Sequence, residues 1–227
     1  MFNFAAMKIL LVAATSPEIK PVTDFLNENN FNKKTSVECL VTGIGMVNTT
    51  LFLASYLAEN KIDLAINCGI AGTFTKKIKS GEVVNVITET YGDFGVEDDK
   101  KFLDIFETGL LQENFQPFSK GKLHLHSLHL PSIKKIKQVS GLTVNKVHGN
   151  EKSIEQIVKK YKPDIESMEG AAFAQVCLTF GIPCIEIRCI SNFIERRNRK
   201  NWKIELAIKN LNLFLEAMLN EFSAQIK

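Results

Sequence analysis

The 227-residue sequence has no uninterrupted apolar stretch of the ~20 residues that a membrane-spanning helix requires. It has no internal repeat, low-complexity tract or Gly/Pro-rich linker that would mark a domain boundary. Its charges nearly balance, since 28 Lys and Arg stand against 25 Asp and Glu, and a net charge of +3 is too small to imply a polyanionic partner. These absences predict one soluble domain, residues 1–227, with neither a membrane nor a nucleic acid as partner.

Motifs for metal, redox and serine chemistry are also missing. The five cysteines are scattered through apolar segments, and no two have the C-x-x-C spacing of a zinc or redox site. We therefore expect them to be reduced and buried in the core. The four histidines include one H-x-H pair without acidic partners at ligand spacing, and no G-x-S-x-G nucleophile motif occurs. The sequence thus predicts neither a metal nor a cofactor.

The N-terminal segment lacks the basic region and the long apolar core of a signal peptide. Met7 directly precedes a strand-like run and is a more natural start than Met1, so we interpret residues 1–6 as an extension. Together with the unpaired cysteines, this favours a cytoplasmic protein.

Apolar strand-like segments alternate with helical segments along the chain. A continuous apolar run such as KILLVAA at Lys8–Ala14 is typical of a strand that is covered on both faces. The expected strands are 8–14, 37–42, 64–68, 82–88, 142–147 and 182–190, with weaker candidates at 122–126 and an amphipathic segment at 102–111. The expected helices are 17–30, 46–60, 151–161, 169–180 and 202–222. This alternation predicts an α/β protein in which a mixed, mostly parallel sheet lies between layers of helices.

Ligands of such sheets bind at the carboxyl ends of the strands, so the residues that follow the strands are the candidates for chemistry. They lie at 14–18, 43–48, 69–72, 147–150, 167–169 and 191–192. Glu18 and Glu169 both stand near the start of a predicted helix, where an acidic side chain is favourable even without a functional role. The two oxygens of Glu169 also suit a vicinal diol such as that of ribose. For Glu18 and for Glu169, a functional role and a purely structural role at the helix start both stay open.

Two further segments and one residue are explained more simply by structure than by function. Gly43-Ile44-Gly45 could hold a phosphate or a dinucleotide, but Asn48 occupies the third glycine position of G-x-G-x-x-G, so a tight turn is favoured over NAD binding. The basic run at 195–203 is more typical of a solvated loop than of a nucleic-acid contact. Arg188 lies inside an apolar run and needs a partner if it is buried.

Five segments, taken in order, resemble the nucleoside phosphorylase and hydrolase superfamily. They are MKILLVAATSPE at 7–18, TGIGMVN at 42–48, NCGIAG at 67–72, ESMEGAA at 166–172 and RCISN at 188–192. The resemblance implies a three-layer α/β/α fold of the nucleoside phosphorylase type. Phosphorylases of this kind carry a phosphate-binding Gly-Asp-Pro-x-Arg loop after the first strand. Here that loop reads Ala14-Thr15-Ser16-Pro17-Glu18, which places a carboxylate where phosphate would bind and implies the hydrolytic branch.

Within this branch the chain is similar to the futalosine hydrolases, a sister family of the methylthioadenosine/S-adenosylhomocysteine nucleosidases. Asn192 separates the two, because the adenine-specific nucleosidases have Asp at the matching position. An amide complements hypoxanthine, since its oxygen accepts from a protonated N7 and its NH₂ donates to O6. The resemblance therefore implies hydrolysis of futalosine to hypoxanthine and dehypoxanthine futalosine in menaquinone biosynthesis. The alternatives are the adenine-specific activity and a non-enzymatic nucleoside-binding protein.

The same resemblance assigns roles to individual residues. Glu18 would activate the attacking water, Glu169 would bind the ribose hydroxyls, and Asn192 would stabilise the leaving base. The residues implied to line the substrate site are Ala14, Ile44, Ala71, Gly72, Val147, Met168 and Ser191. One of Arg196, Arg197 and Arg199 would pair with the benzoate carboxylate of futalosine. The sequence departs from the nucleosidases at two positions that concern ribose binding. Ile70 stands where the nucleosidases often have Ser, and Ser167 stands where they often have a second Glu. Relatives also imply a homodimer.

Overall fold

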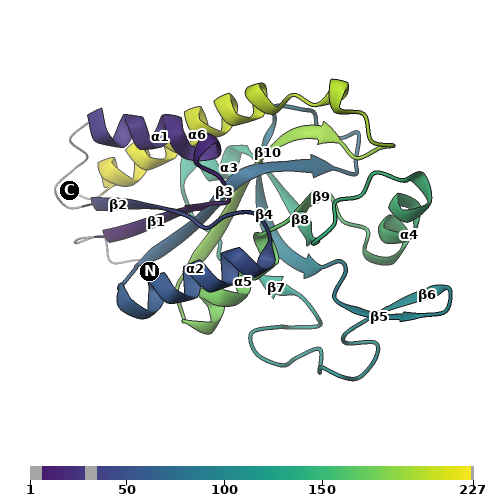
Figure 1. The fold of residues 1–227 in the computed structure, drawn as a ribbon. Coiled ribbons are helices and arrows are strands. Elements are labelled where there is room, and N and C mark those ends of the chain that lie inside the picture. The colour runs from purple at the N-terminus through teal and green to yellow at the C-terminus, as the bar shows by residue number, and fades with distance from the viewer. Residues whose placement is uncertain (1–6, 29–34, 226–227) are drawn as a thin grey trace.

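A computed structural model describes residues 7–28 and 35–225 (Figure 1). The interpretation of residues 1–6 and the expected helix end at Asn30 lie outside the described residues. Within these ranges, no helix combines the length and the apolar character that crossing a membrane requires.

The main sheet has eight strands in the described part of the chain, in the order β10-β4-β8-β9-β3-β1-β2, with β7 beside β4. Their bounds are β1 (Met7–Ala13), β2 (Thr35–Val41), β3 (Leu64–Thr73), β4 (Val83–Tyr91), β7 (Leu123–His124), β8 (Lys137–Thr143), β9 (Ile165–Ser167) and β10 (Cys184–Phe193). The pairs β1–β2, β1–β3, β3–β10, β4–β8 and β8–β9 are parallel. The pairs β4–β10, β3–β9 and β4–β7 are antiparallel. The expected mixed, mostly parallel sheet is confirmed.

β3 organises the sheet because its ten residues are long enough to pair with three strands. Leu64–Asn67 lie beside β1, whereas Gly72 and Thr73 pair with β9 on the same edge. β10 runs along the other edge of β3 and also pairs with β4. The strands β3, β9, β8, β4 and β10 therefore close on themselves, a feature that the sequence did not indicate.

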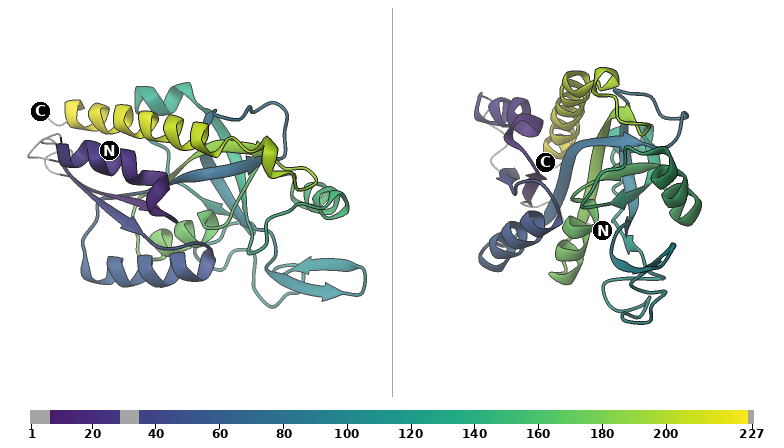
Figure 2. Two further views of the ribbon diagram at one scale, coloured as in Figure 1. Left: turned by 45° about the horizontal axis from the view of Figure 1, so that its top comes forward. Right: turned by 45° about the vertical axis from the view of Figure 1, so that its right-hand side comes forward.

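Helices cover both faces of the sheet, as predicted. They are α1 (Ser16–Glu28), α2 (Met46–Glu59), α3 (Pro131–Lys135), α4 (Glu151–Tyr161), α5 (Gly170–Thr179), α6 (Ile204–Gln225) and the 3₁₀ turn η1 (Arg199–Asn201). Helices α1, α3 and α6 lie on one face, and α2 and α5 lie on the other (Figure 2). Ile9 and Leu11 of β1 pack in the core under α6, whereas Leu10 and Val12 pack in the core under α2 and α5. Because successive strand side chains point to opposite faces, this explains the continuous apolar run in β1.

Several expected boundaries were wrong near the ends of strands. The strand expected at 64–68 continues to Thr73, and the strand expected at 182–190 continues to Phe193, so Ser191 and Asn192 lie within a strand and not after it. These polar and glycine residues remain in the ladder because β3 and β10 pair with each other up to Thr73 and Phe193. The strand expected at 142–147 ends instead at Thr143, which leaves Val147 in the loop before α4.

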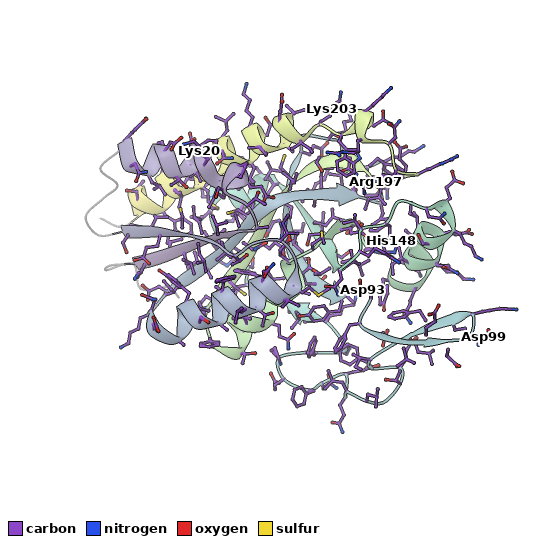
Figure 3. All side chains as sticks on the ribbon, viewed as in Figure 1. Lys20, Asp93, Asp99, His148, Arg197 and Lys203 are labelled. Atoms are coloured by element: carbon purple, nitrogen blue, oxygen red, sulfur yellow. The ribbon has the colours of Figure 1, made fainter. Side chains whose placement is uncertain are left out.

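The segment between β4 and β8 contains a hairpin that the sequence analysis missed. β5 (Gly95–Asp98) and β6 (Lys101–Asp104) pair antiparallel around Asp99, whose φ is 49°. The hairpin protrudes from the molecule, with Asp99 at its tip (Figure 3). The amphipathic segment expected at 102–111 is therefore a strand followed by turns. All five cysteines are free, and four of them are buried as expected, but Cys39 is exposed on β2, the edge strand of the sheet.

Candidate active site

Glu18 lies in the first turn of α1, and only 8% of the residue is exposed. Its Oε2 accepts hydrogen bonds from the Thr15 amide at 3.0 Å and the Thr15 hydroxyl at 2.8 Å. Its Oε1 accepts from the Ile70 amide at 3.1 Å. The helix N-terminus favours an anion here, and the contact with Ile70 holds that anion against β3. Glu18 is therefore fixed at the carboxyl end of β1.

Glu169 directly precedes α5, and its side chain turns away from the helix and does not cap it. Its Oε1 accepts from the Gly45 amide at 3.0 Å, and its Oε2 lies 3.8 Å from Nη1 of Arg188. Gly45 has a φ of 90°, a conformation that favours glycine. Burial raises the pKa of Glu169 above its ordinary value, and the Arg188 charge and the Gly45 amide oppose this rise. The glycine turn thus faces a carboxylate of the protein itself.

Arg188 is 1% exposed and lies between Glu18 and Glu169. We call these three residues the carboxylate cluster. Its Nε donates to Oε1 of Glu186 at 2.6 Å, and its Nη2 donates to Oδ1 of Asn67. A Cβ added at Gly69 would lie 2.4 Å from Nη1 of Arg188 and 2.9 Å from Oε1 of Glu18. The absence of a side chain at Gly69 therefore allows Arg188 and Glu18 to approach the same point. The sequence showed that Arg188 needs a partner but not that its partners include Glu169 and Glu186.

Asn192 lies on β10 directly beside Gly72 of β3. Its Oδ1 accepts from the Ser191 hydroxyl at 2.7 Å, and its Nδ2 donates to the Phe193 carbonyl at 3.1 Å. Ile70, whose amide binds Glu18, is two residues from Gly72 along β3, a separation of ~6.6 Å in a strand. The three residues expected to carry the chemistry are thus brought together around the last residues of β3.

The residues expected to line the substrate site differ in exposure. Ala14, Ala71 and Ser191 are buried, and Gly72 and Met168 are partly exposed. Ile44 is 57% exposed and Val147 is 39% exposed. Both therefore present apolar surface, Ile44 from the glycine turn that binds Glu169 and Val147 from the loop after β8.

One polar pair near this cluster was missed. The amide of His148 donates to Oε1 of Glu166 at 3.0 Å, and its Nδ1 contacts Oε2 of the same carboxylate. Glu166 pairs with Gly72 on the side opposite Asn192. His148 and Glu166 are 18 positions apart, and no local pattern in the sequence connects them.

The arginine segment lies beside this pair. The amide of Arg197 donates to the Gly149 carbonyl at 3.1 Å, and Figure 3 shows Arg197 and His148 at the end of the sheet that carries α4. The guanidinium carbon atoms of Arg197 and Arg199 lie 5.2 and 6.0 Å from the ring centre of Trp202. Two of the three candidate arginines therefore make cation–π contacts with Trp202.

Two cavities lie elsewhere on the described surface. One of about 350 Å³ is lined by residues of α1 and α6, including Pro21 and Leu213. The other, of about 240 Å³, lies between Tyr91, Phe94 and Tyr161. Neither contains a residue of the carboxylate cluster, so we place the chemistry on the convergence of Glu18, Arg188 and Glu169 and not on cavity size.

The chain is similar to known proteins in sequence and in fold. The family model of the phosphorylase superfamily matches residues 8–225. The chain is 30% identical to futalosine hydrolase of Thermus thermophilus, covering 83% of this chain and 84% of that protein. It is 24% identical to 5'-methylthioadenosine/S-adenosylhomocysteine nucleosidase of Buchnera aphidicola, covering 96% and 99%. The solved structure of futalosine hydrolase from Helicobacter pylori has a TM-score of 0.78 at 20% identity, covering 96% and 100%. That structure supports the fold.

Proposed function

Because the chain belongs to the phosphorylase superfamily, whose model spans residues 8–225, we propose that it is a nucleoside hydrolase that cleaves the N-glycosidic bond of futalosine. The expected enzyme class, an N-glycosidase, is confirmed by relatives that are hydrolases and nucleosidases. The observation that carries the hydrolytic assignment is the position of Glu18. Its buried carboxylate stands at the carboxyl end of β1, held by the Ile70 amide. An anion at this point repels phosphate and accepts a proton from water.

Glu18 is the general base of the proposed reaction. As water attacks the anomeric carbon of ribose on the face opposite the purine, Glu18 takes the proton that the water loses. Assistance of this kind typically contributes roughly 10²–10⁴-fold to the rate. The bonds from Thr15 and Ile70 leave little freedom for the carboxylate to rotate. This fixed orientation lowers the cost of placing the water correctly.

Glu169 binds the ribose hydroxyls and favours the positive charge that develops on the sugar. Burial raises the pKa of Glu169 and so disfavours the anion that this role requires. Arg188 and the Gly45 amide act in the opposite direction because they stabilise the anion. Arg188 therefore supports the charged form of a carboxylate that is only 6% exposed.

Asn192 recognises the departing base. Its Oδ1 has a second lone pair beyond the bond from Ser191, and its Nδ2 has a second hydrogen beyond the bond to Phe193. These remaining positions match the N7–H and O6 of a leaving hypoxanthine. An amide gives up no proton, so the proton at N7 comes from water. A mismatched base leaves a buried polar atom unpaired, which costs about 1–3 kcal/mol.

Further residues contact the substrate in the proposed site. We propose that apolar contacts to ribose and base come from residues around the ends of β1, β3 and β8: Ala14, Ile44, Ala71, Gly72, Val147, Met168 and Ser191. Among the three candidate arginines, Arg197 is the best placed for the benzoate carboxylate because its amide is fixed to Gly149. We propose that the products are hypoxanthine and dehypoxanthine futalosine, and that the reaction belongs to menaquinone biosynthesis and takes place in the cytoplasm.

We propose that the chain is a single domain that works as a homodimer. Apolar side chains on α2 support the dimer: Val47 is 76% exposed, Leu51 59% and Phe52 50%. Exposed apolar side chains that are grouped on one helix are typical of a protein–protein contact. This group continues into Ile44, so a partner on this face would lie next to the glycine turn that binds Glu169.

The experiment that tests the function is a base-release assay. Purified protein incubated with futalosine in phosphate-free buffer should release hypoxanthine. Release only after addition of phosphate would assign the chain to the phosphorylases. The second candidate is the adenine-specific nucleosidase, favoured by the 24% identity that extends over 96% of the chain. Adenine release from methylthioadenosine without turnover of futalosine would establish it, and absence of turnover on both would indicate a binding protein.

A further inference from the structure

Two completely buried carboxyl groups lie behind the start of α5, outside the cluster assigned to catalysis. Glu89 comes from β4 and Glu186 from β10, and both are 0% exposed. A Cβ added at Gly170 would lie 2.4 Å from Oε1 of Glu89 and 2.7 Å from Oε2 of Glu186. These two oxygens thus face the same point. In the described part of the chain, neither has a hydrogen-bond partner.

The other oxygen of each carboxyl group is already fixed. Oε2 of Glu89 accepts from the Thr143 hydroxyl at 2.8 Å, and that hydroxyl itself accepts from the Ala171 amide at 2.7 Å. Because the Ala171 bond uses a lone pair, the hydroxyl proton of Thr143 points to Glu89. Oε1 of Glu186 accepts from Nε of Arg188 at 2.6 Å. A proton shared between the two facing oxygens would satisfy both of them without any further group.

Electrostatics leads to the same arrangement. Two completely buried carboxyl groups whose oxygens face one point disfavour ionisation of both, because one cation, Arg188, serves them. Arg188 contacts Glu186 directly, so the negative charge resides on Glu186. Burial, and then the charge of Glu186, raise the pKa of Glu89 well above its ordinary value.

We propose that Glu89 is held protonated and donates a hydrogen bond to Glu186, which makes Glu186 a positioning residue for Arg188. Resting on the proposed function, this gives the pair a role in the reaction. Arg188 is held at its Nε by Glu186 and faces Glu169 with its Nη1, at 3.8 Å. The single negative charge of the pair neutralises part of the positive charge of Arg188. The remaining part stabilises the anions of Glu169 and Glu18.

The groups around Glu89 come from four elements. They are Glu186 and Arg188 from β10, Tyr91 from β4, Thr143 from β8 and the Ala171 amide from α5. Burial first, and then the proximity of Glu89, raise the pKa of Tyr91, so this phenol stays neutral. Arg188 is therefore the cation that balances the pair.

Three variants test the proposal through turnover. In Glu89→Gln, the amide oxygen accepts from Thr143 and the NH₂ donates to Glu186, as the protonated acid does. Glu89→Leu removes the donor, and we expect its kcat to fall about tenfold, whereas Glu89→Gln restores most of this loss. Glu186→Gln leaves Arg188 to act on Glu169 and Glu18 alone. We expect its kcat to fall about 10–100-fold and the acidic limb of its pH profile to move to lower pH.

Infrared spectroscopy tests the protonation state without any substrate, so its outcome does not depend on the proposed function. The wild-type protein at neutral pH should show the C=O stretching band of a buried protonated carboxyl group. The band should disappear in Glu89→Gln and persist in Glu18→Gln, the matched control. A wild-type spectrum without this band, or a Glu89→Gln variant as impaired as Glu186→Gln, would overturn the proposal.

Discussion

The carboxylate of Glu18 accepts a hydrogen bond from the amide of Ile70 at 3.1 Å, across 52 positions of the chain. This bond ties the first turn of α1 to the part of β3 that continues beyond its apolar run. It also distinguishes Glu18 from an acidic residue that only stabilises its own helix, because such a residue has no reason to reach a neighbouring strand. The position of the proposed general base is thus set by two elements together.

Replacing Glu18 by Gln should separate the chemistry of this residue from its structural role. The amide oxygen of Gln still accepts from Ile70, but it takes no proton from water. We expect hypoxanthine release from futalosine to fall by roughly 10²–10⁴-fold in kcat, with a smaller change in KM. Thermal melting of the variant serves as the control and should stay close to that of the wild type. Turnover above about a tenth of the wild-type rate would exclude Glu18 as the base.

Asn192→Asp should weaken the preference for a 6-oxopurine. Asp has no NH₂ to donate to O6, and its charge favours a 6-aminopurine instead. We expect the ratio of kcat/KM for a 6-oxo nucleoside to that for its 6-amino counterpart to fall by about 5–150-fold, equivalent to about 1–3 kcal/mol. Asn60→Asp makes the same chemical change at the end of α2 and should leave the ratio unchanged. An unaltered ratio in Asn192→Asp would refute the assignment of base recognition to this residue.

How far the sequence predicts this molecule depends on the range of the interaction involved. Helix α4 was predicted with its observed bounds because its signals are local: the Asn150 side chain accepts from two amides of the first turn, and apolar residues repeat at helical spacing. The strand ends at 69–73 and 191–193 were predicted to lie beyond their strands. Their composition is typical of turns, and only pairing between distant strands keeps them extended.

The same distinction holds for the site. Glu18, Glu169 and Asn192 were predicted as candidates because each follows an expected strand, and their roles were then implied by the resemblance. The cluster formed by Arg188, Glu186 and Glu89 was not found. Glu89 and Glu186 are 97 positions apart in the sequence, and no local pattern connects them. Only the folded structure, in which both face Gly170, reveals their proximity.

The stability of the protein should depend on pH through Glu89. Its folded-state pKa is raised, chiefly by burial, so above the ordinary pKa of Glu the folded state binds more protons than the unfolded state. Stability therefore falls as pH rises through this window. Glu89→Gln lacks the titrating group, and its stability relative to the wild type should increase between about pH 5 and about pH 8. Urea unfolding midpoints measured at both pH values test this, and parallel curves for the two proteins would contradict it.

Gly170→Ala sets helix propensity against packing. Within α5, Ala is better than Gly by about 1 kcal/mol in helix propensity. The added Cβ, however, would lie 2.4 Å from Oε1 of Glu89 and 2.6 Å from Oε1 of Glu186. Because Thr143 and Arg188 hold these side chains, they have little room to move away. We expect a net loss of about 1–3 kcal/mol in the free energy of unfolding, measured by urea titration. A stabilised variant would show that the carboxyl pair is free to rearrange.

The exposed apolar side chains of α2 predict the oligomeric state. Val47 and Leu51 are four residues apart and so share one helical face, and 76% and 59% of these residues are exposed. Burying them in a symmetric contact removes apolar surface from water, so light scattering should give the mass of two chains. Leu51→Glu places a charge in that contact and should give one chain, with lower turnover because Ile44 and Gly45 adjoin the same face. Leu213→Glu introduces the same charge on α6, where Leu213 is 55% exposed, and should leave the mass at two chains. A wild-type mass of one chain, or equal effects of both substitutions, would remove α2 as the dimer contact.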